Sequence, residues 1–329
     1  MKPKVFIAVS VPPEIEKYIA KHCDYRKWEG EGTIPQDELL KEVSNVEGLL
    51  IQGIKIDKKL LDHAPNLKIV SNVSVGYNNF DIEAMRDRGV IGTHTPYVLD
   101  DTVADLVFGL ILSTARRIPE LDQYVKQGKW KKSDETNLYG TDIHHSTLGL
   151  IGMGRIGEAI AKRGKFGFDM DVLYYNRTPK PKAEKELGVS YTHFKELLQK
   201  SDVIVLMTPL TSETANLIGA NEFKLMKKTA FFINTSRGQT VDEGALLEAL
   251  QTKEILGAGL DVYQQEPINP DHPILRLPNV VTVPHIGSAT AKTRQDMVKV
   301  AAENLVKAVT GDKRQNIVKD LAYINPDKV

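Results

Sequence analysis

Cysteine is almost absent from this chain of 329 residues, and neither sign of charge is in excess. The single Cys23 excludes an internal disulfide and a zinc site built from several cysteines. Because 43 Lys and Arg residues balance 43 Asp and Glu residues, the chain lacks the overall charge that draws a protein to nucleic acid or to an anionic membrane. No apolar run reaches the length of a membrane span or of a secretory signal. We therefore expect a cytoplasmic protein without nucleic-acid or membrane partners.

Strand-like and helix-like stretches alternate along the first hundred residues. Short β-rich runs are separated by polar stretches of helical composition, an order typical of a parallel sheet covered by helices. The expected strands are residues 5–9, 46–51 and 67–71, and the expected helices are residues 14–21 and 59–64.

A long helix is expected after this first sheet. Apolar residues at helical spacing, from Val103 to Ile111, predict a helix over 102–118, with Pro119 just past its end. The stretch 128–145 that follows has no clear period, and irregular stretches of this length are often functional or interfacial.

The second half of the chain contains six stronger candidate strands, with helical segments between most of them. Their order is typical of a doubly wound, nucleotide-binding sheet. The helical stretch 291–309 has no strand after it and could return to pack on the first domain. The strands are expected at residues 148–151, 171–175, 203–207, 230–234, 257–262 and 280–283.

The predicted fold class is therefore α/β, with two Rossmann-like or flavodoxin-like domains built on doubly wound parallel sheets and separated by a cleft. The substrate domain is expected to be discontinuous, formed by residues 1–100 plus 288–329. Residues 101–287 are expected to form the dinucleotide-binding domain.

A glycine loop directly follows the candidate strand 148–151 and opens a helical stretch. Gly152, Gly154 and Gly157 form the pattern G-x-G-x-x-G, which is a weak signal by itself. Between a strand and a helix it predicts a tight turn that brings the backbone close to a pyrophosphate. The alternative is a glycine-rich turn without a ligand.

The residues after the next strand bear on the choice of dinucleotide. An enzyme that uses NAD usually places Asp or Glu there, where it holds the ribose 2′-hydroxyl. This chain instead has Asn176, Arg177 and Thr178, and no acid until Glu184. These side chains favour the 2′-phosphate of NADPH. NADH stays possible, with Arg177 solvated and Asn176 alone serving the ribose.

Three ionisable residues follow the last three candidate strands. Arg237, Glu266 and His285 come two to four residues after strand ends, and ligands of open α/β sheets bind beyond such ends. The set suits hydride transfer to a 2-keto acid. His285 could supply the proton, Glu266 could fix the tautomer of its imidazole, and Arg237 could bind the carboxylate and polarise the carbonyl. Taken singly, each has a structural alternative, such as a salt bridge between Arg237 and Glu266.

No metal site is expected. The sequence contains no H-E-x-x-H motif and no clustered acids, and the pair His144 and His145 is interpreted as exposed rather than as metal ligands.

Over essentially its full length the chain resembles the D-isomer-specific 2-hydroxyacid dehydrogenase family. Within it, the likeness is greatest to the bacterial glyoxylate/hydroxypyruvate reductases, also called 2-ketogluconate reductases. The motifs that carry the resemblance include SVGYNNFD at 74–81, HTP at 94–96, GLIGMGRIG at 149–157, NTSRG at 234–238, GLDVYQQEP at 259–267 and PHIGSA at 284–289.

The resemblance implies roles for the site residues. Arg237 would bind substrate, His285 would donate the proton with help from Glu266, and the backbone amides around Val75 and Gly76 would bind the substrate carboxylate. On the cofactor side it implies Arg155 and Ile156 at the pyrophosphate, Thr208 and Pro209 beside the adenosine, Thr235 and Asp261 at the carboxamide, and Thr102, His285 and Gly287 at the nicotinamide end.

The family also implies a homodimer through the cofactor domains, with residues 130–140 facing the partner. Leu138 or Tyr139 would then enter the partner's active site. We expect NADPH-dependent reduction of glyoxylate, hydroxypyruvate and 2-keto-D-gluconate to the D-2-hydroxy acids. The alternatives are an NAD-dependent enzyme of the D-lactate or D-3-phosphoglycerate type and, from another class, a dinucleotide-sensing corepressor on the same fold.

Overall fold

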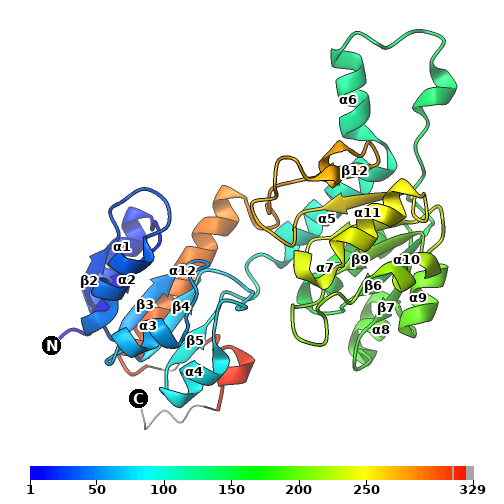
Figure 1. The fold of residues 1–329 in the computed structure, drawn as a ribbon. Coiled ribbons are helices and arrows are strands. Elements are labelled where there is room, and N and C mark those ends of the chain that lie inside the picture. Colours follow the sequence, from blue (N-terminus) through cyan, green and yellow to red (C-terminus); the bar gives the residue numbers. More distant parts are fainter. Residues whose placement is uncertain (313–314, 324–329) are drawn as a thin grey trace. The chain divides into compact units, whose positions relative to one another are not determined.

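Two separate parallel sheets organise the chain, as the computed structural model shows for residues 1–312 and 315–323 (Figure 1). The first unit comprises Met1–Leu99 and Ala289–Val329, and the second comprises Asp100–Ser288. Each unit contains one all-parallel sheet with helices packed on it. The predicted α/β fold with two doubly wound parallel sheets is confirmed.

The first unit has a five-stranded sheet in the order β2-β1-β3-β4-β5, which is the flavodoxin-like order. Its central strands are buried on both faces and therefore consist of nearly continuous apolar residues, such as Gly-Leu-Leu-Ile in β3. The strands are β1 (Lys4–Ile7), β2 (Asp24–Lys27), β3 (Gly48–Ile51), β4 (Ile69–Asn72) and β5 (Ile91–Thr93).

Helices cover both faces of this sheet. The Cβ that Gly48 lacks would contact Leu305 and Val309, so α12 covers the face to which Gly48 is turned. Successive residues of a strand face opposite ways, and Leu49 accordingly joins the other face. The helices are α1 (Pro13–His22), α2 (Gln36–Glu42), α3 (Lys58–His63), α4 (Ile82–Asp87) and α12 (Ala291–Val309), with short 3-10 turns η1 (Val43–Asn45) and η5 (Lys319–Leu321).

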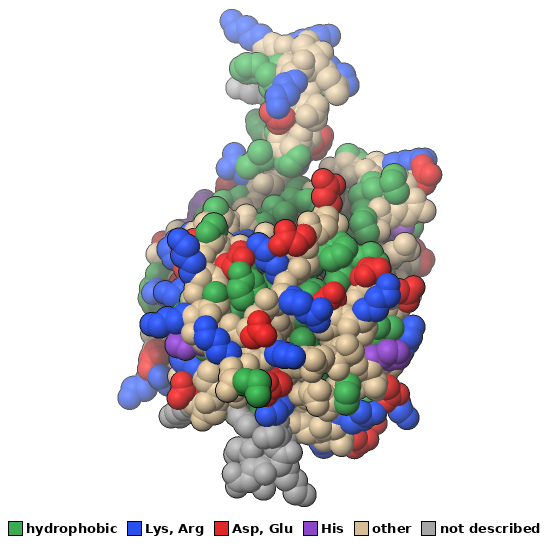
Figure 2. Space-filling view, turned by 90° about the vertical axis from the view of Figure 1, so that its left-hand side faces the viewer, with side chains coloured by type: hydrophobic (Ala, Val, Ile, Leu, Met, Phe, Trp, Pro, Cys, Tyr) green, Lys and Arg blue, Asp and Glu red, His purple; other side chains and the backbone are tan. Residues whose placement is uncertain are grey.

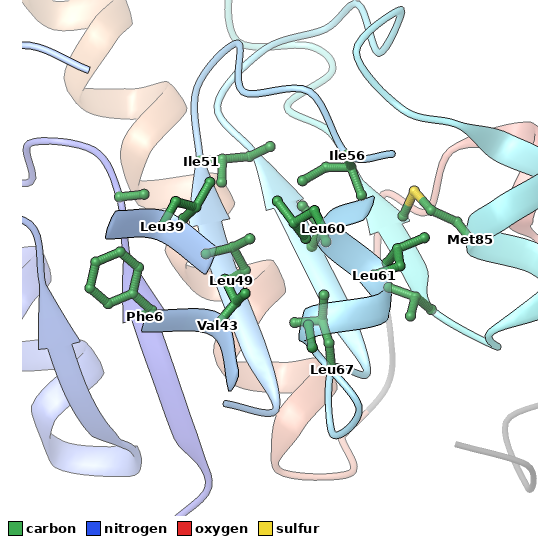
Figure 3. Packing of buried hydrophobic residues seen from close by; sticks show 14 of the residues in the cluster. Phe6, Leu39, Val43, Leu49, Ile51, Ile56, Leu60, Leu61, Leu67 and Met85 are labelled. Carbon is green, nitrogen blue, oxygen red and sulfur yellow. The ribbon is translucent and has the colours of Figure 1, made fainter. Parts of the chain in front are cut away.

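The apolar core on that second face is shown in Figure 3. Side chains from β1 and β3 meet those of α2, α3 and α4 there, and all ten labelled residues are buried. They are Phe6, Leu39, Val43, Leu49, Ile51, Ile56, Leu60, Leu61, Leu67 and Met85.

The second unit has a seven-stranded sheet in the order β12-β11-β10-β9-β6-β7-β8. The strand order reverses at the neighbours β6 and β9, where ligands of open α/β sheets bind. All six expected strands are present, and the short β8 was not expected. The strands are β6 (Thr147–Ile151), β7 (Asp171–Tyr175), β8 (Ser190–Tyr191), β9 (Val203–Leu206), β10 (Phe231–Asn234), β11 (Gly257–Leu260) and β12 (Val280–Thr282).

Helix α5 packs against α7 and against β10, β11 and β12, whereas α9, α10 and α11 form a second group beside the sheet. The helices are α5 (Asp100–Ala115), α6 (Ile118–Lys126), α7 (Arg155–Gly167), α8 (Pro181–Leu187), α9 (Phe194–Lys200), α10 (Ala220–Leu225) and α11 (Glu243–Gln251). Short 3-10 turns are η2 (Glu135–Leu138), η3 (Gly238–Thr240) and η4 (Pro273–Arg276).

The prediction of a single helix over 102–118 is wrong about where the helix ends. Helix α5 ends at Ala115, Arg117 takes a left-handed conformation with φ 56°, and a second helix, α6, begins at Ile118. Pro119 lies in the first turn of α6, where a residue needs no backbone N–H donor. Residues 118–140, which we call the arm, project from the sheet of the second unit (Figure 1).

Charges of both signs intermix on the face of the molecule shown in Figure 2, and neither sign forms a continuous patch there. Among the helices that the structure describes, none combines the length and the apolar character needed to cross a membrane.

Candidate active site

The three ionisable residues at strand ends lie together in the second unit. Strands β10, β11 and β12 are neighbours and run parallel, so their carboxyl ends meet at one edge of the sheet. Arg237 follows β10, Glu266 follows β11 and His285 follows β12. Glu266 is hydrogen-bonded to His285, and its charge also acts on Arg237.

His285 and Glu266 form a short hydrogen bond of 2.6 Å between Nδ1 and Oε2. A carboxylate oxygen accepts, so Nδ1 carries the proton and Nε2 is left for another partner. The two side chains are 47% and 35% exposed, which leaves the imidazole accessible from solvent. The second carboxylate oxygen, Oε1, accepts the backbone N–H of Tyr263 at 3.0 Å.

The surroundings of Glu266 keep its carboxyl group ionised. Burial by itself would raise its pKa, but the hydrogen bonds from His285 and from the Tyr263 amide, together with the charges of His285 and Arg237, lower the pKa below its ordinary value. The group can therefore accept the Nδ1–H bond as a carboxylate across the neutral range.

A network of buried polar groups holds the loop that presents Arg237. Asn234 Oδ1 accepts from the amide and the hydroxyl of Ser236, and Asn234 Nδ2 donates to the carbonyl of Arg237 at 3.1 Å. Thr240 Oγ1 donates to the same carbonyl at 2.6 Å. Burial lowers the pKa of the Arg237 guanidinium, and the charge of Glu266 opposes this shift. A partly desolvated cation at this position is suited to binding an anion.

Gly238 lets the loops after β10 and β11 press against each other. A Cβ at this position would lie 1.8 Å from the carbonyl carbon of Tyr263, so only glycine fits. The backbone beside Arg237 thereby touches the segment that leads to Glu266.

The backbone at His285 is in the left-handed region, with φ 51°, which is unusual for a residue other than glycine. Asp261, only 1% exposed, stabilises this conformation: its two oxygens accept the amides of Ile286 at 2.6 Å and Gly287 at 2.9 Å. Burial raises the pKa of Asp261, and the two amides and the charge of His285 oppose this shift. Asp261 thus fixes the segment that carries His285.

The glycine loop between β6 and α7 has the geometry of a tight turn. Gly152 has φ 107°, and a Cβ there would lie 2.4 Å from the carbonyl oxygen of Met207. A Cβ on Gly157 would lie 2.3 Å from the carbonyl oxygen of Gly152. Gly154 has nothing within 4 Å of its Cβ position and is the N-cap of α7, with no side-chain cap hydrogen bond. The helix N-terminus is therefore open to an anion.

The three polar residues after β7 are placed differently from one another. Asn176 Oδ1 accepts the amide of Met153 at 3.1 Å and so braces the glycine loop. Arg177 and Thr178 are exposed, and Arg177 Nη1 lies 3.2 Å from Glu213 Oε2. Glu213 comes from the loop after β9, so an acid does reach this region from another strand.

The remaining expected cofactor residues of the second unit lie on the same loops and helix starts. The hydroxyls of Thr208 and Thr235 are buried and have no hydrogen-bond partner within the described part of the chain. Arg155, at the start of α7, donates from Nε to Asp100 Oδ2 at 3.2 Å. Ile156 follows it in α7, Thr102 lies in the first turn of α5, and Pro209 is exposed.

Val75 and Gly76 lie in the first unit, in the loop after β4, and both are partly exposed. His94 Nδ1 donates to the carbonyl of Val75 at 2.9 Å, and Asn72 Nδ2 donates to that of Gly76 at 3.1 Å.

Comparison of the chain with known proteins identifies the family to which it belongs. Residues 108–287 match the D-isomer specific 2-hydroxyacid dehydrogenase, NAD binding domain. The chain is 45% identical over 318 residues to the glyoxylate/hydroxypyruvate reductase B of Yersinia pestis, an alignment that covers 97% of this chain and 98% of the relative. The chain belongs to the D-isomer specific 2-hydroxyacid dehydrogenase family.

This dehydrogenase is also similar to solved structures of enzymes in complex with NADP and of enzymes in complex with NAD. An NADPH-dependent glyoxylate/hydroxypyruvate reductase from Sinorhizobium meliloti, in complex with NADP and malonate, matches with a TM-score of 0.85 and 31% identity over 98% of each chain. A D-lactate dehydrogenase from Aquifex aeolicus, complexed with NAD and lactic acid, matches with a TM-score of 0.83 and 30% identity over 96% of this chain and 98% of that one. The chain is an NAD(P)-dependent oxidoreductase.

The residues of this dehydrogenase fit a nicotinamide dinucleotide. Two buried hydroxyls without partners, those of Thr208 and Thr235, need a hydrogen-bonding group that the described part of the chain does not supply. The open side of Gly154 and the uncapped start of α7 provide room and backbone donors for a pyrophosphate.

Several residues contact or brace the site residues of this dehydrogenase in ways that the sequence pattern did not predict. Tyr263 is buried, and its hydroxyl donates to the carbonyl of Val283 at 3.0 Å, which ties the ends of β11 and β12 together. Burial raises its pKa to about 12. The sequence did not predict that Glu213 lies near the cofactor residues, because Glu213 follows β9 whereas its partner Arg177 follows β7. Gly238 could have been suspected from its place beside Arg237.

Proposed function

We propose that this dehydrogenase reduces glyoxylate, hydroxypyruvate and 2-keto-D-gluconate to the D-2-hydroxy acids, with NADPH as the preferred cofactor. The observation that carries the proposal is the hydrogen-bonded pair of His285 and Glu266, at 2.6 Å, beside Arg237 at one sheet edge. The name of the Yersinia pestis relative, a glyoxylate/hydroxypyruvate reductase, supports this substrate class.

The three side chains divide the chemistry of the carbonyl group. NADPH, when bound, supplies the hydride to the carbonyl carbon. His285 donates the proton from Nε2 to the developing alkoxide, while its Nδ1–H stays bonded to Glu266. The carboxylate of Glu266 compensates the positive charge of the protonated imidazole and keeps the ring in one orientation. Arg237 binds the substrate carboxylate and stabilises the negative charge on the carbonyl oxygen.

The first unit is proposed as the substrate domain and the second as the cofactor domain. The amides of Val75 and Gly76 would bind the substrate carboxylate. Around the cofactor, the glycine loop with Arg155 and Ile156 would hold the pyrophosphate. Thr208 and Pro209 would lie beside the adenosine, and Thr102, Thr235, Asp261, His285 and Gly287 would surround the nicotinamide.

Preference for NADPH rests on Arg177, Thr178 and Asn176 after β7, where no acid follows the strand. Two observations favour NADH as the second candidate. Asn176 Oδ1 is already bonded to Met153, and Glu213 places a carboxylate beside Arg177, where it would repel a 2′-phosphate. The Aquifex aeolicus relative binds NAD.

The protein is proposed to act as a homodimer, with the arm against a second copy. Leu138 or Tyr139 would enter the partner's active site. Tyr139 is 66% exposed in the single chain and has the apolar surface to do so.

The deciding experiment measures oxidation of NADPH and of NADH with hydroxypyruvate, glyoxylate and 2-keto-D-gluconate in parallel. A higher kcat/KM with NADPH is expected. A higher kcat/KM with NADH would overturn the cofactor assignment and leave the catalytic residues in place. The absence of turnover with every pair would overturn the proposed substrate class.

A further inference from the structure

Three successive peptide groups after β4 have their carbonyl oxygens tied to the protein. The carbonyl of Ser74 accepts the amide of Thr95 at 2.9 Å. The carbonyl of Val75 accepts from His94 Nδ1 at 2.9 Å, and that of Gly76 accepts from Asn72 Nδ2 at 3.1 Å. A carbonyl oxygen only accepts, so both side chains act as donors here.

Tying these oxygens fixes the directions of three N–H groups. In a planar trans peptide the C=O and the N–H point in opposite directions. The amides of Val75, Gly76 and Tyr77 are therefore turned away from the donors that hold Ser74, Val75 and Gly76. Within residues 1–312 and 315–323, none of these three amides donates a hydrogen bond. Consecutive backbone amides that have no partner within the protein are the groups from which anion-binding sites are built.

Asn72 is itself held firmly. Its side chain is buried, with 1% exposure of the residue, and its second amide hydrogen donates to Asn79 Oδ1 at 3.3 Å. Because Nδ2 faces two acceptors, turning the amide over would place an oxygen against both of them. Asn79 is in turn anchored by its donation to the carbonyl of Ile54 at 2.7 Å.

His94 is fixed at both ends of its backbone. Its amide donates to the carbonyl of Asn316 at 3.1 Å, and its carbonyl accepts from Asn304 Nδ2 at 3.0 Å. The imidazole lies edge-on to the ring of Tyr77, with 5.9 Å between the ring centroids. The donor that holds Val75 therefore has little freedom to move.

We infer that Asn72 and His94 are positioning residues that hold the amides of Val75, Gly76 and Tyr77 ready for the carboxylate of a 2-keto acid. The inference rests on the proposed function and adds Tyr77 to the expected pair of amides. Neither side chain needs to touch the substrate. Each acts by fixing a peptide plane before the substrate arrives, so that less entropy is lost on binding.

The test uses glyoxylate, which has almost nothing besides its carboxylate and carbonyl group. The variants are Asn72→Ala, His94→Leu and His94→Asn, since the Asn amide nitrogen can take the place of Nδ1 as a donor. The matched control is Ser71→Ala, which removes a buried hydrogen bond of 2.7 Å to the carbonyl of Ala301 from the same strand. The readouts are KM for glyoxylate, kcat, Kd for NADPH and Tm.

We expect Asn72→Ala and His94→Leu to raise the KM about five- to twentyfold with little change in kcat or in Kd for NADPH. His94→Asn should restore most of the affinity, and Ser71→Ala should lower the Tm without raising the KM. If Asn72→Ala does not fold, the comparison of His94→Leu with His94→Asn decides.

An unchanged KM in folded Asn72→Ala and His94→Leu would overturn the inference. A KM in His94→Asn as high as that in His94→Leu would also overturn it. An equally large rise of the KM in the Ser71→Ala control would overturn it as well. Failure of the wild-type protein to reduce any of the three 2-keto acids is a different result, which overturns the proposed function itself.

Discussion

At the scale of single residues, the candidate site depends on how His285 is held. Its side chain is bonded to Glu266, and its unusual backbone conformation is stabilised by the buried carboxylate of Asp261. Glu266 and His285 could be predicted from the ends of candidate strands, whereas Asp261 was named only through the family resemblance. The use of both Asp261 oxygens by the neighbouring backbone could not be predicted, because it follows from a left-handed residue that the sequence does not reveal.

Replacing His285 tests the proton donor. In His285→Ala we expect kcat to fall about 10²- to 10⁴-fold, because general acid catalysis by a side chain contributes on this order. The Kd for NADPH should stay close to the wild-type value, as measured by the fluorescence of the bound cofactor. Wild-type turnover in this variant would show that another group supplies the proton.

The lowered pKa of Glu266 predicts how stability depends on pH. A carboxyl group whose pKa is lower in the folded state stabilises the fold above its unfolded value, ordinarily 4.5, and loses that contribution as the pH falls through the folded value. The difference in unfolding free energy between the wild type and Glu266→Gln should therefore be present above pH 4.5 and shrink below it. Urea unfolding at a series of pH values measures it. A difference that grows toward lower pH would contradict the sign.

At the scale of elements, burial explains which strands could be predicted. Strands such as β3, β9 and β10 are buried at every position and consist almost entirely of apolar residues. The strands that were not predicted are short or polar: β2 alternates exposed and half-buried residues, β5 has three residues and β8 has two. Helix α6 was not predicted, although its apolar residues Ile118, Leu121 and Val125 recur at helical spacing; none of its described residues is buried, so this apolar side does not join the core of the chain.

Loops from different elements also meet in ways that no single stretch reveals. Arg177 after β7 pairs with Glu213 after β9, although 36 positions separate them. We expect Arg177→Ala to weaken NADPH binding roughly ten- to a hundredfold, the effect of losing a charge-assisted contact, and to leave NADH binding nearly unchanged.

Glu213→Gln is the complementary change, and it should strengthen NADPH binding because it removes a negative charge that would repel the 2′-phosphate. The gain should be no more than about fivefold, since the carboxylate and the arginine are both exposed to solvent. The gain should diminish at high salt. Titration of both cofactors at two ionic strengths measures the two effects. Equal losses for NADPH and NADH in Arg177→Ala would contradict the role at the 2′-phosphate.

At the scale of the whole molecule, the arm offers an apolar surface for assembly, since helix α6 buries none of its described residues in the single chain. Several of its apolar side chains are exposed by half or more, and such surface is typical of an interface. They are Ile118, Val125, Trp130 and Tyr139.

We expect sedimentation analysis to show a dimer for the wild type and a shift toward monomer for Trp130→Ser/Tyr139→Ser. Phe166→Ser is the matched control, because Phe166 is a similarly exposed aromatic residue on α7, away from the arm in sequence. A control that dissociates as readily as the arm variant would argue against the arm as the interface. In Leu138→Ala/Tyr139→Ala, unchanged substrate selectivity would count against their entry into the partner's site.

Because α12 packs on the first sheet, it affects how the protein folds during its synthesis. On the ribosome, residues 1–99 emerge while the face of β3 and β4 that receives Leu305 and Val309 has no helix to cover it. Residues 100–288 must be translated first, which takes roughly ten to forty seconds at ordinary rates of synthesis. By the end of that time all seven strands of the second unit have been synthesised, so that unit can close its own core before α12 is available. The domain whose synthesis begins first is thus the one that is completed last.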